Sequence, residues 1–368
     1  MGKEKGNKLY HSLDKYLGIP AVVLLGLFRK KHSKPPKIHK IGIMSIVSIG
    51  DNVLVSAILS DIRKKYSDAE ITVFTGKTNY DLVNLIPGID HIIKLEISNL
   101  QKSRNMIHSA GKFDVLLDIG SWTRLSAIYS WMADAFYKVG FKSQGQYRHY
   151  IFDHSVTHSR MRHELDNYRN LISDIVPNPS ELPNLKIEPS EKVDRLLGGK
   201  NCIIHAWPGG YKSFMKEWDN KNWAELVGKI HQDFDRIFLT GSPADVSASQ
   251  KLFNLIKESK INNIVDLAGQ LSLAETVYLV SRSQLVFSVN TGIAHVTAAL
   301  GIPQICLHGP TNIRRWGPYS NKTISVCPDK GTYGYLHFGN EYHLAKENCM
   351  DNISVNKIIK EYNKIKNI

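Results

Sequence analysis

The sequence predicts an α/β protein made of two similar halves. Short apolar runs that favour strands alternate with amphipathic helical patterns, first over residues 40–118 and again from residue 201 onward. A stretch with four prolines, Pro177 to Pro189, separates the halves and is typical of an interdomain connection. The 368 residues are enough for two domains of ordinary size.

The first half opens with a buried strand over residues 40–48, which ends in the loop S-I-G-D-N. A helix is predicted over residues 53–66, with apolar positions at 54, 57, 58 and 62. Further strands are predicted over residues 71–74 and 115–118, and a glycine follows each. This alternation is typical of a Rossmann-like half.

The second half repeats the pattern, with strands over residues 201–205, 236–240 and 263–266. One helix begins near Lys221, and another covers residues 274–281 with Ser272 as its cap. Asp233-Phe-Asp235 has the D-x-D spacing that holds a metal in other proteins. It precedes a strand, at the opposite end of the sheet from bound ligands, and is interpreted as a surface turn.

The strongest signals for a ligand lie in residues 285–320. A buried strand over residues 285–289 ends in Asn290-Thr291-Gly292, and a second over residues 304–307 ends in H-G-P-T. A helix turn around His295 lies between them. Ligands of open α/β sheets bind at such strand ends, and N–H groups at a helix start attract anions. Four side chains add hydrogen-bonding groups: Thr291, His295, Thr297 and Thr311. We expect a phosphate or diphosphate here; an ordinary βαβ unit, with glycines for turns and threonines for caps, is the alternative.

The formal net charge of +13 indicates an anionic partner, such as nucleic acid, an acidic membrane surface or a phosphorylated substrate. No basic recognition helix, zinc-finger spacing or RNA-binding aromatic motif is present, so nucleic acid is not expected. The four cysteines show no C-x-x-C pair, which favours a reducing cytosol.

Residues 1–39 differ from the rest and are expected to form a membrane-associating segment and linker. Residues 1–40 contain ten Lys or Arg and two acids, a net charge of +8, around the uncharged run L-G-I-P-A-V-V-L-L-G-L-F at 17–28. Twelve residues are too few to span a bilayer, which needs about 20. A short helix lying in the interface of an anionic membrane fits better. The alternative is an extra helix that packs on the protein.

The stretch N-T-G-I-A-H-V-T-A-A-L-G-I-P, followed by H-G-P-T-N-I-R-R-W-G-P-Y, resembles the C-terminal signature of glycosyltransferase family 9, the ADP-heptose lipopolysaccharide heptosyltransferases. That family usually has D-[ST]-G-x-x-H-x-A-A-A-x-x-x-P and then G-P-T, often with R-W-x-P-Y. The resemblance covers roughly residue 41 to the end and rests on four separated motifs. Asn290 departs from it, because the family usually has Asp there.

The S-x-G-D start at Ser48 resembles the first motif of the family, whose Asp is the proposed catalytic base, so Asp51 takes that role by resemblance. Without the resemblance, a cap at a helix start would be the favoured interpretation of Asp51. Ser45 and Val47 depart from the family, which often has Arg and Ser at these positions.

Two further segments carry donor residues by resemblance. Lys216, in K-E-W-D, matches the Lys proposed to meet the donor diphosphate, and Asp245 matches an acid that contacts the nucleoside. The expected donor-binding set is Gly209, Gly210, Lys216, Asp245, Asn290, Thr291, Gly292, His295, Gly309 and Thr311.

The resemblance implies a GT-B fold, two Rossmann-like domains facing a cleft, with an acceptor domain at residues 40–180 and a donor domain at 181–348. The remaining residues, 349–368, begin with the C-M-x-x-I ending of the family, and their helix is expected to cross back to the first domain.

The implied reaction is inverting and metal-independent transfer of a heptose from ADP-heptose to the inner core of lipopolysaccharide. No cofactor is expected. The partners would be a nucleotide-sugar donor, a lipid-linked anionic saccharide acceptor and the inner-membrane surface, with the protein cytoplasmic and peripheral on the inner face of that membrane. Two alternatives stay open: another nucleotide-sugar donor, which Asn290 permits, or a non-catalytic nucleotide-sugar-binding membrane protein.

Overall fold

The structure is a computed structural model that describes residues 14–210, 212–337 and 348–366. The chain divides into two compact units between Lys186 and Ile187, inside the proline-containing connection. We call these units the first and the second domain. The first thirteen residues of the expected membrane-associating segment lie outside the described residues.

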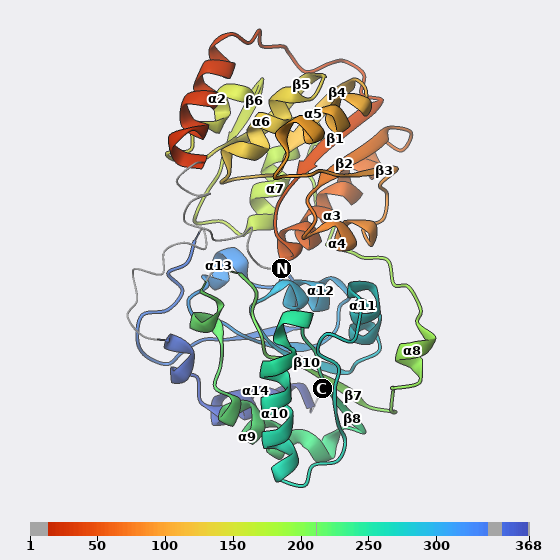
Figure 1. The fold of residues 1–368 in the computed structure, drawn as a ribbon, viewed down its shortest axis with the longest axis vertical. Coiled ribbons are helices and arrows are strands. Elements are labelled where there is room, and N and C mark those ends of the chain that lie inside the picture. Colours follow the sequence, from red (N-terminus) through yellow and green to blue (C-terminus); the bar gives the residue numbers. More distant parts are fainter. Residues whose placement is uncertain (1–13, 211, 338–347, 367–368) are drawn as a thin grey trace. The chain divides into compact units, whose positions relative to one another are not determined.

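The first domain is a six-stranded sheet with the order β3-β2-β1-β4-β5-β6, in which every paired strand is parallel to its neighbour. Its strands are β1 (Lys40–Ser45), β2 (Glu70–Thr75), β3 (His91–Lys94), β4 (Phe113–Asp118), β5 (Ala135–Lys142) and β6 (His154–Thr157). Its helices are α2 (Gly18–Leu27), α3 (Ile49–Lys65), α4 (Tyr80–Asn84), α5 (Leu100–Ser109), α6 (Arg124–Met132), η1 (Arg148–Ile151) and α7 (Glu164–Ile172) (Figure 1).

The second domain repeats this topology with the order β12-β11-β10-β7-β8-β9, again parallel throughout. Its strands are β7 (Asn201–His205), β8 (Arg236–Leu239), β9 (Ile264–Asp266), β10 (Leu285–Val289), β11 (Gln304–Leu307) and β12 (Thr323–Val326). Its α-helices are α8 (Glu191–Asp194), α9 (Asn220–Ile230), α10 (Val246–Glu258), α11 (Leu273–Ser281), α12 (Gly292–Ala299), α13 (Ile313–Trp316) and α14 (Val355–Lys366). The two Rossmann-like halves predicted from the sequence are confirmed.

Helix α3 begins four residues earlier than the apolar pattern predicted. Ser48 is its N-cap, and Asp51, three residues later, completes a capping box: the Asp51 amide donates to Ser48 Oγ at 3.3 Å, and the Ser48 amide donates to Asp51 Oδ2 at 3.0 Å. Two orphan amides of the helix start are thus satisfied, so the helix extends to Ile49. Ser272 caps α11 in the same way with Glu275, as predicted.

The last helix, α14, packs within the second domain. Its buried residues Val355, Ile358 and Tyr362 join the core beside α9, β11 and β12. The Tyr362 hydroxyl donates to Asp233 Oδ2 at 2.8 Å. This apolar stripe has its partner within its own domain.

Asp233 and Asp235 lie before β8, at the amino end of the sheet, as predicted. Asp235 Oδ2 accepts from the Lys200 amide at 2.7 Å, so both carboxylates hold neighbouring segments together.

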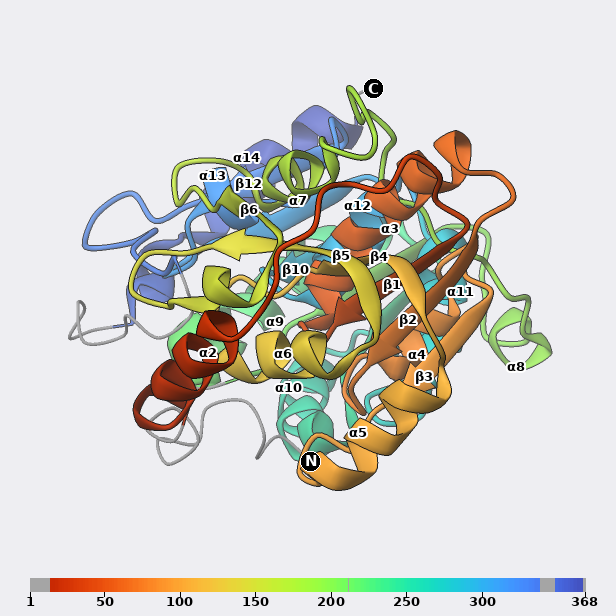
Figure 2. The ribbon, with the colours of Figure 1, turned by 90° about the horizontal axis from the view of Figure 1, so that it is seen from above.

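Helix α2 packs on the first domain beside α6, as Figures 1 and 2 both show, and beside η1. Val22 is fully buried among Ala127, Ile151 and Phe152. Gly26 lies against Tyr150 so closely that a Cβ there would be 2.6 Å from the Tyr150 carbonyl oxygen. One face of α2, which carries Val22 and Gly26, therefore packs on the protein, as the alternative interpretation of this segment expects. In the described ranges, no helix combines the length and the apolar character needed to cross a bilayer.

Ion pairs hold both ends of this segment. Before the helix, the Asp14 carboxylate forms an ion pair with the Arg124 guanidinium at 2.7 Å. The same carboxylate accepts a hydrogen bond from the Arg124 backbone N–H at 2.8 Å and so caps the start of α6. After the helix, the Arg29 guanidinium donates to the buried Asp153 carboxylate and to the Ile151 carbonyl. Asp153 also accepts from the backbone of His32 and Lys138. The segment from Asp14 to His32 is therefore a fixed part of the first domain.

We predict that Arg29→Met destabilises the first domain by about 3 kcal/mol, because it leaves the Asp153 carboxylate buried without its cation. Urea unfolding followed by circular dichroism measures the loss. Lys30→Met, an equal change at the exposed neighbouring residue, is the control and should stay within about 0.5 kcal/mol of wild type. Equal stability of the two variants would contradict a structural role for the Arg29 pair.

Candidate functional site

Four loops of the second domain meet at the carboxyl edge of its sheet, after β7, β8, β10 and β11. Pairing sets this edge: Ser288 lies beside His205, and Val289 beside Leu307. The sheet order reverses between β7 and β10, where open α/β sheets bind ligands. These loops and the segments that follow them hold every residue expected to bind the donor: Gly209, Gly210, Lys216, Asp245, Asn290, Thr291, Gly292, His295, Gly309 and Thr311.

The loop after β10 is fixed by the residue that departs from the family pattern. The backbone N–H of Asn290 donates to the Leu307 carbonyl at 3.0 Å. Its side-chain Nδ2 donates to the Trp316 carbonyl at 2.8 Å. A carboxylate at this position cannot donate to that carbonyl. Asn290 therefore ties the loop to α13, which carries the R-R-W motif.

Thr291 and Gly292 form the start of α12. Thr291 is the N-cap, yet its side chain makes no capping bond. Thr291 Oγ1 and Thr311 Oγ1, in adjacent loops, are both buried without a hydrogen-bond partner among the described residues. Orphaned hydroxyls are uncommon in protein interiors, and these two are available to a polar ligand. Thr297, which we expected to add a third group, instead donates to the Ile293 carbonyl at 2.8 Å within its own helix.

Three buried histidines lie at or just beyond this edge: His205, His295 and His308. Burial lowers the pKa of His308 to about 3, and the neighbouring His295 adds to the shift. Burial likewise lowers the pKa of His205 to about 4, and its Nδ1 lies 2.9 Å from Thr240 Oγ1. His205 and His308 are therefore neutral at pH 7. Sequence reasoning did not select either one as a site residue.

Lys216 and Asp245 approach the loop after β7 from different segments. Lys216 ends the turn η2 (Ser213–Lys216), and its Nζ donates to the Gly209 carbonyl at 3.2 Å. Asp245 ends the turn η4 (Pro243–Asp245), where its Oδ2 accepts from the Ser242 amide at 2.8 Å in a third capping box. Burial raises the pKa of Glu217, and the charge of Asp245 adds to that rise.

Gly309 has a packing role that the sequence did not suggest. A Cβ at this position would lie 2.4 Å from Met350 Sδ. The G-P-T loop and the C-M motif, 40 residues apart, therefore meet at a place where only glycine fits.

In the first domain, Asp51 lies after β1 at the corresponding carboxyl edge, beside the reversal of strand order between β1 and β4. Its Oδ2 accepts from Ser48, and its Oδ1 accepts from the Tyr168 hydroxyl at 3.2 Å. Tyr168 comes from α7, 117 residues further along the chain. Asp51 thus belongs to a helix cap and also bonds to a distant tyrosine.

A buried ion pair supports the next strand of this edge. Asp118, at the end of β4, pairs with Arg148 at 2.8 Å, and both side chains are fully buried. His158 lies 3.0 Å from Glu164 in a second buried pair. Residues 141–169 are rich in His, Arg and Tyr, and these pairs place part of that basic character inside the domain.

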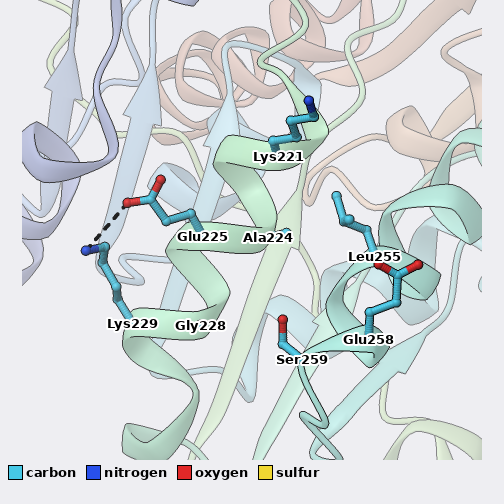
Figure 3. Close-up of a pocket in the computed structure, with 8 residues that line it drawn as sticks. All are labelled: Lys221, Ala224, Glu225, Gly228, Lys229, Leu255, Glu258 and Ser259. Atoms are coloured by element: carbon cyan, nitrogen blue, oxygen red, sulfur yellow. Dashed lines mark ion pairs between the residues drawn. The ribbon is translucent and has the colours of Figure 1, made fainter.

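A surface hollow of about 510 Å³ lies between α9 and α10 (Figure 3). Half of its lining residues are exposed and charged, namely Lys221, Glu258 and the Glu225–Lys229 pair at 3.5 Å. None of the residues expected to bind the donor lines it. It therefore has no part in the candidate site.

The sequence profile of glycosyltransferase family 9 (heptosyltransferase) matches residues 109–342. A lipopolysaccharide core heptosyltransferase of Haemophilus influenzae is 25% identical over 346 residues, covering 88% of this chain and 96% of that protein. A lipooligosaccharide heptosyltransferase 2 of the same species is 21% identical, with 76% of this chain and 85% of that protein covered.

Solved structures of the same class share the fold. An ADP-heptose lipopolysaccharide heptosyltransferase II from E. coli superimposes with a TM-score of 0.72 at 19% identity, covering 89% of this chain and 98% of that one. A family 9 glycosyltransferase from Veillonella parvula gives 0.76 at 19% identity, with 91% and 99% covered. An E. coli heptosyltransferase solved with ADP gives 0.68 at 17% identity, with 89% and 99% covered.

We predict that the second domain loses stability as the pH falls from about 6.5, the pKa of an unfolded histidine, towards 4. The folded pKa values of His205 and His308 are depressed, so the unfolded chain binds more protons in this window. The loss should be on the order of 2 kcal/mol per histidine by pH 4.5. Urea unfolding at pH 7, 5.5 and 4.5 measures it.

The variant His308→Gln should reduce this acid sensitivity. His39→Gln, at an exposed histidine, should leave the acid sensitivity as in wild type. If His308→Gln loses as much free energy of unfolding between pH 7 and pH 4.5 as wild type, then His308 is not a buried neutral histidine in the folded protein.

Proposed function

The chain belongs to glycosyltransferase family 9, the heptosyltransferases, and is thus a glycosyltransferase. On this premise we propose that it transfers a heptose from ADP-heptose to the inner core of lipopolysaccharide, with inversion at the sugar carbon. The relatives named as lipopolysaccharide core and lipooligosaccharide heptosyltransferases support the sugar and the class of acceptor. The observation that carries the proposal is the carboxyl edge of the second sheet, where a glycine loop begins α12 beside two orphaned threonine hydroxyls.

In this proposal the donor diphosphate binds at that edge. Backbone N–H groups at Gly292, Gly209 and Gly309, with the Lys216 ammonium, surround the diphosphate oxygens. The diphosphate also forms hydrogen bonds with the side chains of Thr291, Thr311 and His295. The nucleoside of the donor binds at Asp245 and Gly210. As the glycosidic bond breaks, negative charge grows on the leaving ADP. Fixed dipoles and one cation stabilise that charge, so the proposed step needs no metal.

Asp51 is the proposed general base, which takes the proton of the acceptor hydroxyl as that oxygen attacks the sugar carbon. A carboxylate has about four lone-pair sites. Ser48 N–H, Ser48 O–H and Tyr168 O–H occupy three of them and fix the orientation of the carboxylate. Within the described part of the chain no further group donates to this carboxylate, which leaves one site for the acceptor proton. Tyr168 is thus a positioning residue for Asp51.

The proposed acceptor is lipid-linked and anionic, which matches the net charge of +13. The enzyme would then work at the inner face of the inner membrane as a peripheral protein.

A family 9 transferase with another nucleotide-sugar donor is the second candidate, favoured by Asn290 in place of the usual Asp. The bond from Asn290 to the Trp316 carbonyl gives this residue a role in holding the loop, whichever donor binds.

We predict that Asp51→Asn lowers kcat by about 10²–10⁴-fold and leaves the Kd for ADP unchanged, because it removes the charge and keeps the size. Ser272→Ala is the matched control: it removes the corresponding cap of α11 at a cost of about 1 kcal/mol and touches no proposed catalytic group, so kcat should survive. Single-turnover transfer and calorimetric ADP binding measure the two quantities. Full kcat in Asp51→Asn would remove this residue as the base.

We predict that Lys216→Ala weakens ADP binding about tenfold or more, because a charge-assisted bond to the diphosphate is lost. Lys221→Ala, at an exposed lysine on α9, is the control and should bind ADP like wild type. Calorimetric titration with ADP measures both. Wild-type transfer should also persist in EDTA; activity that EDTA abolishes and Mg²⁺ restores would overturn the metal-free account.

A further inference from the structure

The outer face of α2 is apolar although the helix lies on the surface of the first domain. The helix sequence is GIPAVVLLGL, without a charged or hydrogen-bonding side chain. Leu24 is 55% exposed, Leu27 66% and the following Phe28 88%. A helix that packs on a protein by one stripe normally carries polar residues on the other. No contact among the described residues covers this outer face.

Aromatic and basic side chains lie next to this helix and the segment that follows it. Phe136 is half-exposed and its ring lies 4.9 Å from that of His32, and Tyr150 is half-exposed against Gly26. Lys30 and Lys31 follow Phe28 directly and are exposed, and no ion pair within the described ranges uses them. Apolar residues flanked by aromatic rings and lysines are typical of helices that lie in a membrane interface.

The face is held in place before any partner arrives. Asp14 pairs with Arg124 ahead of the helix, and Arg29 with Asp153 after it. A surface that needs no ordering on binding loses less conformational entropy than a flexible anchor.

We propose that the outer face of α2, formed by Leu17, Leu24, Leu27 and Phe28, docks onto an anionic lipid surface, with Lys30 and Lys31 at the phosphate level. The inference deepens the peripheral location proposed above and rests on it. Charge selects the occupant: a second copy would bring the same basic flanks together, whereas anionic lipid neutralises them. The helix has ten residues, so it lies in the plane of the interface and does not cross the membrane.

The test is co-sedimentation of the full chain with vesicles, without donor or acceptor, so that its result is independent of the transfer reaction. Wild type should bind phosphatidylglycerol/phosphatidylethanolamine vesicles, bind phosphatidylcholine vesicles at least tenfold more weakly, and be released partly by high salt. The double variant Leu24→Glu/Leu27→Glu should lose at least tenfold in partitioning. Its thermal unfolding should match wild type, because both side chains are exposed.

Two controls separate the apolar and the basic contributions. Leu182→Glu, at a leucine of the same domain that is 61% exposed, should bind vesicles like wild type. Lys30→Gln/Lys31→Gln should weaken binding to anionic vesicles, whereas Lys65→Gln/Lys112→Gln, at two exposed lysines elsewhere, should not.

Three results would overturn the inference. The first is wild type that does not bind anionic vesicles, and the second is Leu24→Glu/Leu27→Glu that binds them like wild type. The third is a wild-type dimer in solution that this double variant converts to a monomer, which would make a second copy the occupant. Transfer to a soluble, delipidated core oligosaccharide should be the same in wild type and Leu24→Glu/Leu27→Glu; its absence in both would count against the proposed reaction alone.

Discussion

The parallel pairing of β10 with β7 is the constraint on which the candidate site depends. Backbone bonds place Leu285 to Ser288 beside Cys202 to His205, although some 80 residues separate the strands in sequence. The chain first adds β8 and β9 on one side of β7 and then returns to add β10 on the other. The loops after β7 and β10 therefore leave in opposite directions, the arrangement at which open α/β sheets bind ligands. The first domain applies the same rule to β1 and β4.

Much of this arrangement could be predicted because its signals are local. Apolar runs bounded by glycine loops located β7 and β10 to the residue, and strand direction then placed the loops at one edge. The contacts within that edge could not be predicted in the same way. Nothing near Asp51 in the sequence indicates Tyr168, and nothing near Asp118 indicates Arg148, because these pairs exist only after the sheet is built. The packing partners of α14 could not be predicted for the same reason: its apolar stripe fits more than one surface, and only the built sheet decides between them.

The serine-to-acid spacing recurs at the edges of both sheets. Ser48 with Asp51, and Ser242 with Asp245, each close a capping box in the loop after a strand. The cap fixes the carboxylate against the backbone at the end of the sheet where ligands bind. Cap and site interpretations are thus compatible, because a carboxylate that chemistry needs in one orientation gains that orientation from the helix it caps. Sequence reasoning treated the two interpretations as competitors for Asp51.

The docking of α2 also sets an order of events during synthesis. Arg29 bonds to Ile151 and Asp153, which are synthesised more than 120 residues later. Asp14 likewise pairs with Arg124, which is synthesised long after it. The twelve apolar residues at 17–28 therefore leave the ribosome well before the surface that receives Val22 exists. At about 5–20 residues per second, this interval lasts roughly 6–25 s. Throughout it the nascent chain presents an uncovered apolar run with basic flanks, so a chaperone or a membrane can meet this segment before its own domain does.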